Sequence, residues 1–203
     1  MIKIVDYGLG NVLAFQSLYK RLNIQVSIAR TAADLADCSR LILPGVGAFD
    51  HAMQLLEASG MRATLDQLVL GKGVPVLGIC VGMQVIARSS DEGSLTGLGW
   101  IDGHVRAFRS LQRDELLLPH MGWNDVTPAA GAKLFSQLET DARFYFLHSY
   151  FFDCAYGSNV AAVSRYGIEF CSAVHSRNIH GVQFHPEKSH HFGVQLLKNF
   201  AEL

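Results

Sequence analysis

The sequence predicts an α/β fold of three layers built on a mostly parallel central sheet, and two observations carry this prediction. The first half of the chain alternates short β-branched apolar runs with stretches whose apolar residues repeat at helical spacing. Strand and helix in alternation require parallel pairing through right-handed crossovers, which places helices on both faces of the sheet. From Gly103 onward, strand candidates follow one another closely, which favours extra antiparallel strands in the C-terminal half.

The elements of the first half follow from local signals. Residues 2–5 form an apolar strand, and Gly8-Leu9-Gly10-Asn11 is a turn and helix cap rather than a phosphate loop. The third glycine of the dinucleotide fingerprint and the lysine of a P-loop are both missing. Strands are then expected over 24–28, 40–43 and 74–79, and helices after Asn11 and over 32–37, 48–59 and 64–70.

The second half is expected to contribute strands over 105–108, 122–126, 144–152, 160–163, 170–174 and 179–184, and a closing helix over 189–201. No repeat, low-complexity tract or long linker interrupts the 203 residues, so we expect one domain over 1–203. Ligands of such sheets sit beyond the carboxyl ends of the strands, where Gly8, Gly45 and Cys80 would fall.

Composition excludes several classes of partner and compartment. Seventeen basic and eighteen acidic residues give a formal charge of −1, which disfavours binding to nucleic acid or to an anionic membrane. No apolar run approaches the roughly 20 residues of a membrane span, and the N-terminus reaches Asp6 at once, so we expect neither a leader nor a span. The four cysteines are widely scattered, which fits a reducing cytoplasm.

The pentapeptide Gly78-Ile79-Cys80-Val81-Gly82 directly follows an apolar strand and predicts a nucleophile at a strand-to-helix turn. Small residues two before and two after Cys80 keep such a turn free of side-chain clashes. A helix N-terminus beside the sulfur would favour the thiolate, which is the nucleophilic form.

His185-Pro186-Glu187 supplies the base that a cysteine nucleophile needs and a carboxylate that orients the base. Residues two apart at the end of a strand point to the same side, so the imidazole and the carboxylate can face one cleft. Either motif alone is weak, because glycines around a cysteine also occur in ordinary tight packing. Together, each at the end of a predicted strand, they indicate a Cys80–His185–Glu187 triad.

An oxyanion formed when sulfur attacks a carbonyl also needs donors. The N–H of Val81 is one candidate, and a second is the loop Pro44-Gly45-Val46-Gly47, where glycines let the backbone approach a ligand. On its own, that loop reads as a simple strand-to-helix turn.

These motifs, in this order, resemble the class I (triad) glutamine amidotransferases. The matching segments are Gly78 to Gln84, Pro44 to Phe49 and Gly181 to Ser189. Within that class the closest resemblance is to the glutaminase subunits of imidazole glycerol phosphate synthase. That resemblance is carried by Asp6 to Asn11, Pro119 to Asn124 and Phe146 to Tyr150, and it runs essentially end to end.

The resemblance implies a flavodoxin-like class I amidotransferase fold and hydrolysis of glutamine to glutamate, with Cys80 as nucleophile, His185 as acid and base, and Glu187 orienting His185. It implies Val46 and Val81 as oxyanion donors, with the Val46 peptide turned away until the partner is loaded. The residues implied in glutamine binding are Gly45, Gly47, Gln84, His148, Ser149 and Tyr150.

The implied partner is a (β/α)8-barrel cyclase subunit, in a heterodimer, that uses the ammonia to make imidazole glycerol phosphate and aminoimidazole carboxamide ribotide in histidine biosynthesis. Met121, Gly122, Trp123 and Asn124 are implied at that interface. From the residues alone, Trp123 is as readily a buried strand residue as an exposed anchor.

Three alternatives remain at this point. A paralogue with the same glutaminase would supply ammonia to another acceptor, such as a surface-polysaccharide sugar. A stand-alone cysteine hydrolase or peptidase would act without a partner, and a silent binding module would not need the triad. No cofactor is expected and no metal site, because His190 and His191 diverge on a helix and read as solvated residues at an exposed helix start.

Overall fold

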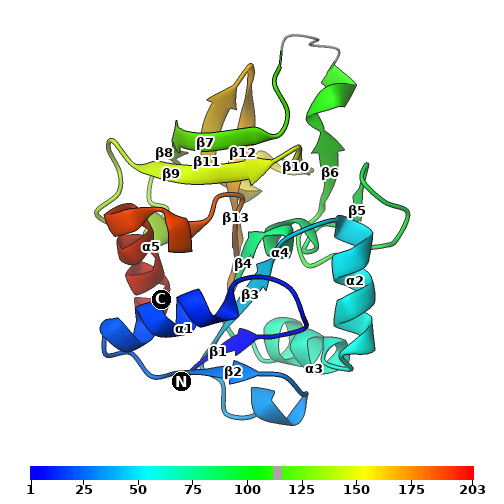
Figure 1. Ribbon diagram of the computed structural model, residues 1–203, viewed down its shortest axis with the longest axis vertical. Helices are drawn as coiled ribbons and strands as arrows, with labels where there is room; N and C mark the ends of the chain where they lie inside the picture. Colours follow the sequence, from blue (N-terminus) through cyan, green and yellow to red (C-terminus); the bar gives the residue numbers. More distant parts are fainter. Residues whose placement is uncertain (112–115) are drawn as a thin grey trace.

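The computed structural model describes residues 1–111 and 116–203, and its main feature is one large twisted sheet flanked by helices (Figure 1). The main path of the sheet runs β2-β1-β3-β4-β13-β12-β10-β6-β5, with β11 and β8 attached through β12. The predicted fold class, α/β with a mostly parallel core and added antiparallel strands, is confirmed.

The parallel part of the sheet uses four strands from the first half and one from the end of the chain. Its members are β2 (Val26–Ala29), β1 (Ile2–Val5), β3 (Arg40–Gly45), β4 (Val76–Cys80) and β13 (Ile179–Val182). Strands β4 and β13 are buried throughout, as expected of strands covered by helices on both faces. Because β13 lies directly beside β4, the C-terminal segment that follows β13 reaches the same sheet edge as Cys80.

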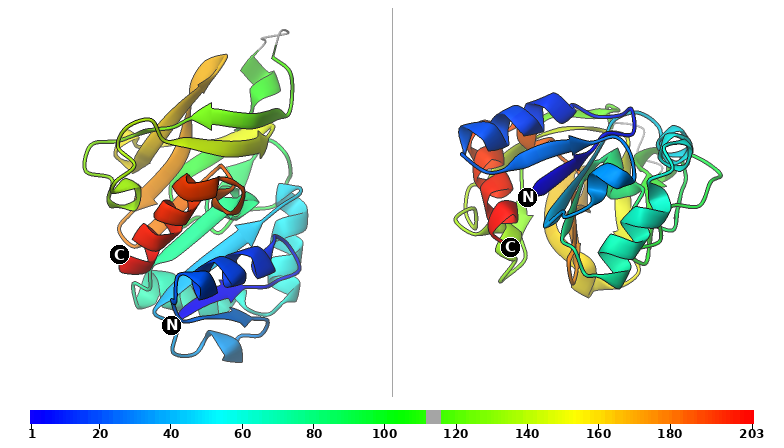
Figure 2. Two further views of the ribbon diagram at one scale, coloured as in Figure 1. Left: turned by 60° about the vertical axis from the view of Figure 1, so that its left-hand side comes forward. Right: turned by 90° about the horizontal axis from the view of Figure 1, so that it is seen from below.

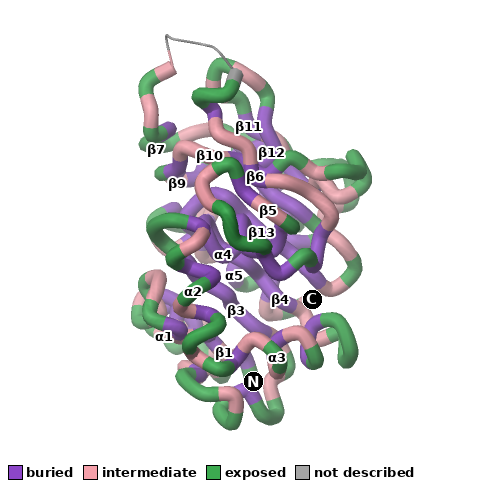
Figure 3. Tube along the Cα trace, turned by 90° about the vertical axis from the view of Figure 1, so that its right-hand side faces the viewer, coloured by how far each residue is buried: buried purple, intermediate pink, exposed green. Residues whose placement is uncertain are grey.

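Helices cover both faces of this parallel core, as Figures 1 and 2 show. Helices α1 (Val12–Arg21) and α5 (His190–Glu202) lie on one face, and α2 (Phe49–Ala58) and α3 (Arg62–Asp66) lie on the other. The Asn11 side chain accepts a hydrogen bond from the Ala14 N–H at 3.2 Å, so the predicted helix cap is confirmed. Buried residues follow the central strands, and exposed residues mark the outer faces of the helices and the loops (Figure 3).

The C-terminal half adds antiparallel strands to the sheet edge and builds a second, two-stranded sheet. The added antiparallel strands are β12 (Ile168–Ser176), β10 (Tyr150–Cys154), β6 (Gly103–Ala107), β11 (Val160–Tyr166) and β8 (Thr127–Pro128). The short strand β5 (Ser89–Ser90) pairs in parallel with β6. The second sheet pairs β7 (His120–Asp125) with β9 (Arg143–His148), with His120 opposite His148.

The single strand expected over 144–152 is wrong. The chain breaks at Ser149, so that β9 belongs to the small sheet and β10 to the large one. The break is held by a hydrogen bond from the Phe108 N–H to the Ser149 carbonyl. Phe144 and Phe146 alternate inward along β9, whereas Phe151 and Phe152 are adjacent and both buried. The alternation of buried and exposed residues is lost because the chain passes from β9, which is covered on one face, to β10, which is covered on both faces.

Two expected helices are shorter or less regular than predicted. Residues 32–37 form only a 3-10 turn, Ala33–Leu35, where the Asp34 carboxylate accepts the N–H groups of Arg30 and Thr31 and so favours a local turn. The stretch 64–70 divides into α3 and a π turn, Gln67–Gly71. Further 3-10 turns lie at Phe108–Leu111, Lys133–Phe135, Gly157–Asn159 and Pro186–Lys188. Among the described residues, no helix has the length and apolar character to cross a membrane.

Candidate active site

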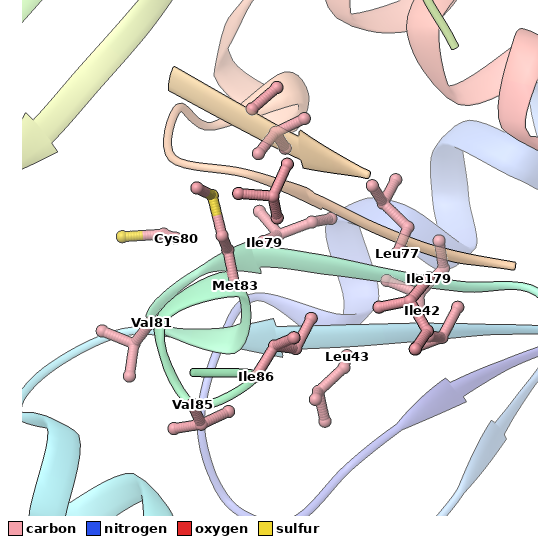
Figure 4. Close-up of a cluster of buried hydrophobic side chains, with 14 of the residues drawn as sticks. Ile42, Leu43, Leu77, Ile79, Cys80, Val81, Met83, Val85, Ile86 and Ile179 are labelled. Atoms are coloured by element: carbon pink, nitrogen blue, oxygen red, sulfur yellow. The ribbon is translucent and has the colours of Figure 1, made fainter. Parts of the chain in front are cut away.

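Cys80 stands at the carboxyl end of β4 in a backbone conformation that side chains rarely adopt. Its φ and ψ are 55° and −113°, and it is paired with Gly45 at the end of β3. A conformation of this kind costs of order 1–3 kcal/mol and persists only when the surroundings enforce it. Figure 4 shows the sulfur pointing out of the cluster of buried aliphatic side chains formed by β3, β4 and α4 (Val81–Gln84). The strand-to-helix turn predicted at Cys80 is present.

Two glycines make this turn possible. A Cβ on Gly78 would meet the Gly82 carbonyl oxygen at 2.5 Å, and a Cβ on Gly82 would overlap the Leu43 carbonyl oxygen. Both obstacles are backbone atoms, so neither can move aside without opening the turn. Glycine at both positions therefore allows β4 to pass this close to β3 while Cys80 projects outward.

The helix that follows Cys80 is a single turn. Helix α4 has only four residues, because the Val85 carbonyl accepts the Leu98 N–H and Arg88 donates to Gly103, so the chain joins neighbouring segments instead of continuing the helix. A single turn has a small macrodipole.

His185 and Glu187 follow β13, and His185 lines the cavity beside Cys80. The His185 Nδ1 lies 2.9 Å from the Glu187 Oε1, and both side chains are almost completely buried. The main chain at His185 is fixed twice, because its N–H donates to the Tyr145 carbonyl at 2.9 Å and its carbonyl accepts from the Ser189 hydroxyl at 2.6 Å. The imidazole is therefore held in one orientation, with Nδ1 toward the carboxylate.

Opposing effects set the proton affinity of His185. Burial lowers its pKa, but the side chains of Cys80 and Glu187 raise it through hydrogen bonds and charge, and the net result is a pKa of about 9 instead of 6.5. The imidazolium is thus the stable form at neutral pH.

A cavity of about 260 Å³ opens at Cys80 and His185. This lies just below the range of about 300–1,000 Å³ typical of drug-sized ligands, so it suits a molecule the size of an amino acid. The other residues that line it are Val46, Gly47, Val81, Gln84, Glu92, Pro119, Leu147, His148, Ser149, Tyr150 and Lys188. Two larger hollows, of about 660 and 590 Å³, lie beside residues 129–134 and the C-terminus, and neither contains Cys80, His185 or Glu187.

The structure brings nearly all the predicted glutamine-binding residues to this cavity. Gln84 is buried, and its Nε2 lies 3.0 Å from the Gln183 Oε1 and 3.4 Å from the Tyr150 carbonyl oxygen. Gly45 does not line the cavity itself but lies behind the turn, opposite Cys80. Val46 is 44% exposed at the cavity rim, and Gly47 beside it has a φ of 101°, which glycine adopts without strain.

The predicted interface residues divide between the two faces of β7. Met121 and Trp123 point outward, 64% and 41% exposed, and Trp123 stacks on the His190 ring at 5.3 Å. Asn124 points inward instead, because its Nδ2 lies 3.2 Å from the His120 Nε2 and 3.0 Å from the Arg165 carbonyl oxygen. Among the described residues no group of three or more histidine, cysteine, aspartate or glutamate side chains is placed to hold a metal ion.

Sequence reasoning missed four residues that the structure places in or directly behind the site. Glu92 is the one carboxylate lining the cavity among the described residues, and its Oε2 accepts the Phe49 N–H at 2.8 Å. Gln183 donates to the Cys80 sulfur at 3.7 Å, and Ser189 anchors His185. His120 lies behind His148 at 2.9 Å. Gln183 and Ser189 flank the His-Pro-Glu motif, whereas no local signal marks Glu92, which follows a two-residue strand.

With this geometry established, comparison with known proteins gives a consistent result. Residues 3–203 match the family model described as glutamine amidotransferase class-I. The chain is 62% identical over 204 residues to the imidazole glycerol phosphate synthase subunit HisH of Bdellovibrio bacteriovorus, and 51% identical to that of Leptospira interrogans, with all of both chains covered in each case.

Solved structures with the same fold are far less similar in sequence. PurLQS from Thermotoga maritima matches with a TM-score of 0.71 at 16% identity, covering 99% of this chain and 97% of the other. The glutaminase domain of Trypanosoma brucei CTPS, solved with bound acivicin, matches with a TM-score of 0.64 at 17% identity, covering 99% and 93%. The family model and the full-length relatives together show that this chain belongs to the class-I glutamine amidotransferases and, within them, to the HisH subunits of imidazole glycerol phosphate synthase.

Proposed function

We propose that this chain is the glutaminase subunit of a cytoplasmic imidazole glycerol phosphate synthase. It hydrolyses glutamine to glutamate and passes the ammonia to a (β/α)8-barrel cyclase partner in a heterodimer, for histidine biosynthesis. The observation that carries the proposal is that Cys80 and His185 line one small cavity and Glu187 lies within hydrogen-bond distance of His185, in a chain 62% identical over its whole length to a HisH subunit.

In the first half-reaction the Cys80 thiolate attacks the carboxamide carbon of glutamine and forms a C–S bond. The carbonyl π electrons move to oxygen, and the N–H groups of Val81 and Val46, both at the cavity, stabilise the oxyanion. When the intermediate collapses, the C–N bond breaks and the His185 imidazolium gives its proton to the nitrogen, so that neutral ammonia leaves. A γ-glutamyl thioester remains on Cys80.

In the second half-reaction His185 is neutral and acts as base. It takes a proton from water as the water oxygen attacks the thioester, and the C–S bond breaks to release glutamate and the thiolate. Glu187 holds Nδ1 of His185 at 2.9 Å throughout, so Nε2 is the nitrogen that carries the proton to and from the reacting atoms. The resting thiolate–imidazolium pair is thereby restored.

Glutamine recognition follows from the charges and carbonyls that line the cavity. Glu92 offers a negative charge for the α-ammonium group, and burial raises the pKa of its carboxyl above the usual range. Gln84 and the chain at His148, Ser149 and Tyr150 line the remaining wall and provide amide and carbonyl groups for the polar substrate. A zwitterionic amino acid fits this lining better than a peptide segment does.

The partner surface lies at the mouth of the same cavity. Leu117, Met121, Trp123 and Leu147 are exposed apolar side chains, and Leu147 and Val46 also line the cavity. A protein that covers this surface would close the cavity to solvent and receive ammonia without loss to water. Exposed aromatic and methionine side chains are typical anchors of such interfaces.

The test compares glutamine turnover by the chain alone and with the cyclase from the same organism. We expect turnover to rise strongly on complex formation, and Cys80→Ala to abolish glutamine-dependent synthesis while leaving complex formation and ammonia-dependent synthesis intact. Full turnover by the chain alone would refute the gated glutaminase and favour a stand-alone hydrolase. Turnover with the cyclase but without imidazole glycerol phosphate formation would assign the ammonia to another acceptor.

A further inference from the structure

A chain of buried hydrogen bonds runs behind the cavity from strand β7 to the turn between β9 and β10. His120 and His148 are opposite one another on β7 and β9, with the His120 Nδ1 2.9 Å from the His148 Nε2. At one end the His148 Nδ1 lies 2.7 Å from the Tyr150 carbonyl oxygen, and at the other the Asn124 Nδ2 lies 3.2 Å from the His120 Nε2. None of these side chains takes a proton to or from the reacting atoms.

The direction of every hydrogen bond in this chain is fixed by its two ends. The Tyr150 carbonyl can only accept, so the His148 Nδ1 carries the proton and, in a neutral ring, the His148 Nε2 accepts. The His120 Nδ1 must then donate, which leaves its Nε2 to accept from Asn124. The second hydrogen of the Asn124 amide goes to the Arg165 carbonyl, which fixes the amide orientation.

Burial keeps both rings neutral over the whole range in which the site works. Desolvation lowers the pKa of His148 to about 3 and that of His120 to about 4. The His120 ring is stacked between Phe146, at 4.8 Å, and Tyr166, at 4.1 Å, so it has no room to turn over. One tautomer of each ring satisfies every polar atom, and the opposite tautomer of either ring would place two donors or two acceptors face to face.

The Tyr150 carbonyl connects this chain of hydrogen bonds to the side chains that support the catalytic cysteine. It also receives the Gln84 Nε2, which donates to Gln183, which in turn donates to the Cys80 sulfur. The same carbonyl belongs to the turn at residues 148–150 that lines the cavity. A shift of His148 would therefore displace the cavity wall at residues 148–150.

We propose that His120 and Asn124 are positioning residues that lock His148 in its Nδ1–H tautomer and thereby hold the glutamine-binding turn at Tyr150. Because Met121 and Trp123 lie on the opposite face of β7, this chain also ties the cavity wall to the strand that faces the partner. The kinetic consequence rests on the proposed glutaminase function, whereas the tautomer assignment does not.

The structural part is tested by nitrogen-15 NMR of the full chain labelled at histidine. We expect His120 and His148 both to carry the proton on Nδ1, with no change between pH 6 and 8. An Nε2–H tautomer at either ring, or titration of either in that range, would overturn the proposal.

The functional part is tested in the complex with His120→Phe, which keeps the ring stacking but removes both nitrogens. Loss of one hydrogen bond to His148 corresponds to about a tenfold effect. We expect KM for glutamine to rise about tenfold while kcat, ammonia-dependent synthesis and alkylation of Cys80 by iodoacetamide change less than about twofold. His120→Asn places an N–H at the position of Nδ1 and should recover most of the loss.

His180→Phe is the matched control, because His180 is equally buried but lies on β13 away from the cavity. If KM rises equally in this control, or if His120→Asn does not restore KM, the rise in KM of His120→Phe is due to lost packing. Either result would overturn the proposal. If His120→Phe does not fold, Asn124→Leu carries the test: we expect His120 to show the Nε2–H tautomer in part and KM to rise about threefold. Absence of glutamine turnover in the wild-type complex would refute the glutaminase function and leave the tautomer result standing.

Discussion

Replacing Glu187 with glutamine should move the pH at which the enzyme works, not merely slow it. The substitution keeps an acceptor oxygen within reach of the His185 Nδ1 and removes the negative charge. Glu187 supplies two of the four interactions that raise the pKa of His185, while the burial that lowers it stays. We therefore expect the pKa of His185 to fall from about 9 toward its ordinary value of 6.5 in Glu187→Gln.

The size of the effect follows from the fraction of imidazolium at each pH. The group has its raised pKa in the folded wild type, so the imidazolium is lost only as the pH rises through about 9. At pH 8 that fraction drops from roughly 0.9 to roughly 0.03 in the variant, a loss of about thirtyfold or about 2 kcal/mol. At pH 6 both proteins are mostly protonated, so this part of the loss nearly disappears.

The assay is the steady-state rate of glutamate formation by the complex between pH 6 and 9.5. We expect the high-pH limb of the variant to shift downward by two units or more. Any loss of rate already present at pH 6 reports an altered orientation of the His185 ring. The prediction therefore concerns the ratio of the loss of rate at pH 8 to the loss of rate at pH 6. A loss of equal size at both pH values would refute the assignment of the raised pKa of His185 to Glu187.

Two further substitutions test the turn at Cys80 and the partner surface. Gly82→Ala would drive a Cβ into the Leu43 carbonyl and should lower the free energy of unfolding by about 1–3 kcal/mol in urea titrations, whereas Gly157→Ala, with open space around its Cβ position, should change it by less than about 0.5 kcal/mol. Equal effects of the two would contradict the tight approach of β3 and β4. Trp123→Ala should weaken the complex by about 2 kcal/mol, or about thirtyfold in Kd by calorimetry. Leu70→Ala, at an exposed leucine in the π turn that precedes β4, should not weaken it. An unchanged Kd for Trp123→Ala would place the partner on another surface.

Much of the parallel core can be predicted from the sequence because the signals for its strands, caps and turns are local. Each of these signals lies within a few residues and indicates one backbone conformation. They are the apolar runs that form β1, β3 and β4, the helix cap at Asn11 and the glycines around Cys80. Cys80 and His185 each come at the end of a predicted strand. The sequence predicts that they lie close together only if the two strands are assumed to pair in parallel. The pairing of β13 with β4 supplies that step.

The parts that escaped prediction depend on contacts between distant segments. The break at Ser149 depends on which sheet each half of 143–154 joins. The short helix α4 ends because the backbone of residues 85–88 forms hydrogen bonds with residues 97–103. Glu92 is placed at the cavity by β5, a strand of only two residues that is too short to show a pattern of apolar residues in the sequence. The inward direction of Asn124 follows from the pairing of His120 with His148, which no spacing in the sequence reveals.

The central claim, that ammonia made at Cys80 is delivered to a barrel partner and not to solvent, is tested most directly by isotope transfer. The complex is given glutamine labelled with nitrogen-15 in its carboxamide, together with the cyclase substrate and an excess of unlabelled ammonium at neutral pH, and the imidazole product is analysed by mass spectrometry. The account predicts that nearly every product molecule carries nitrogen-15 despite the excess of unlabelled ammonium. Product with the isotope ratio of the bulk ammonium would contradict it.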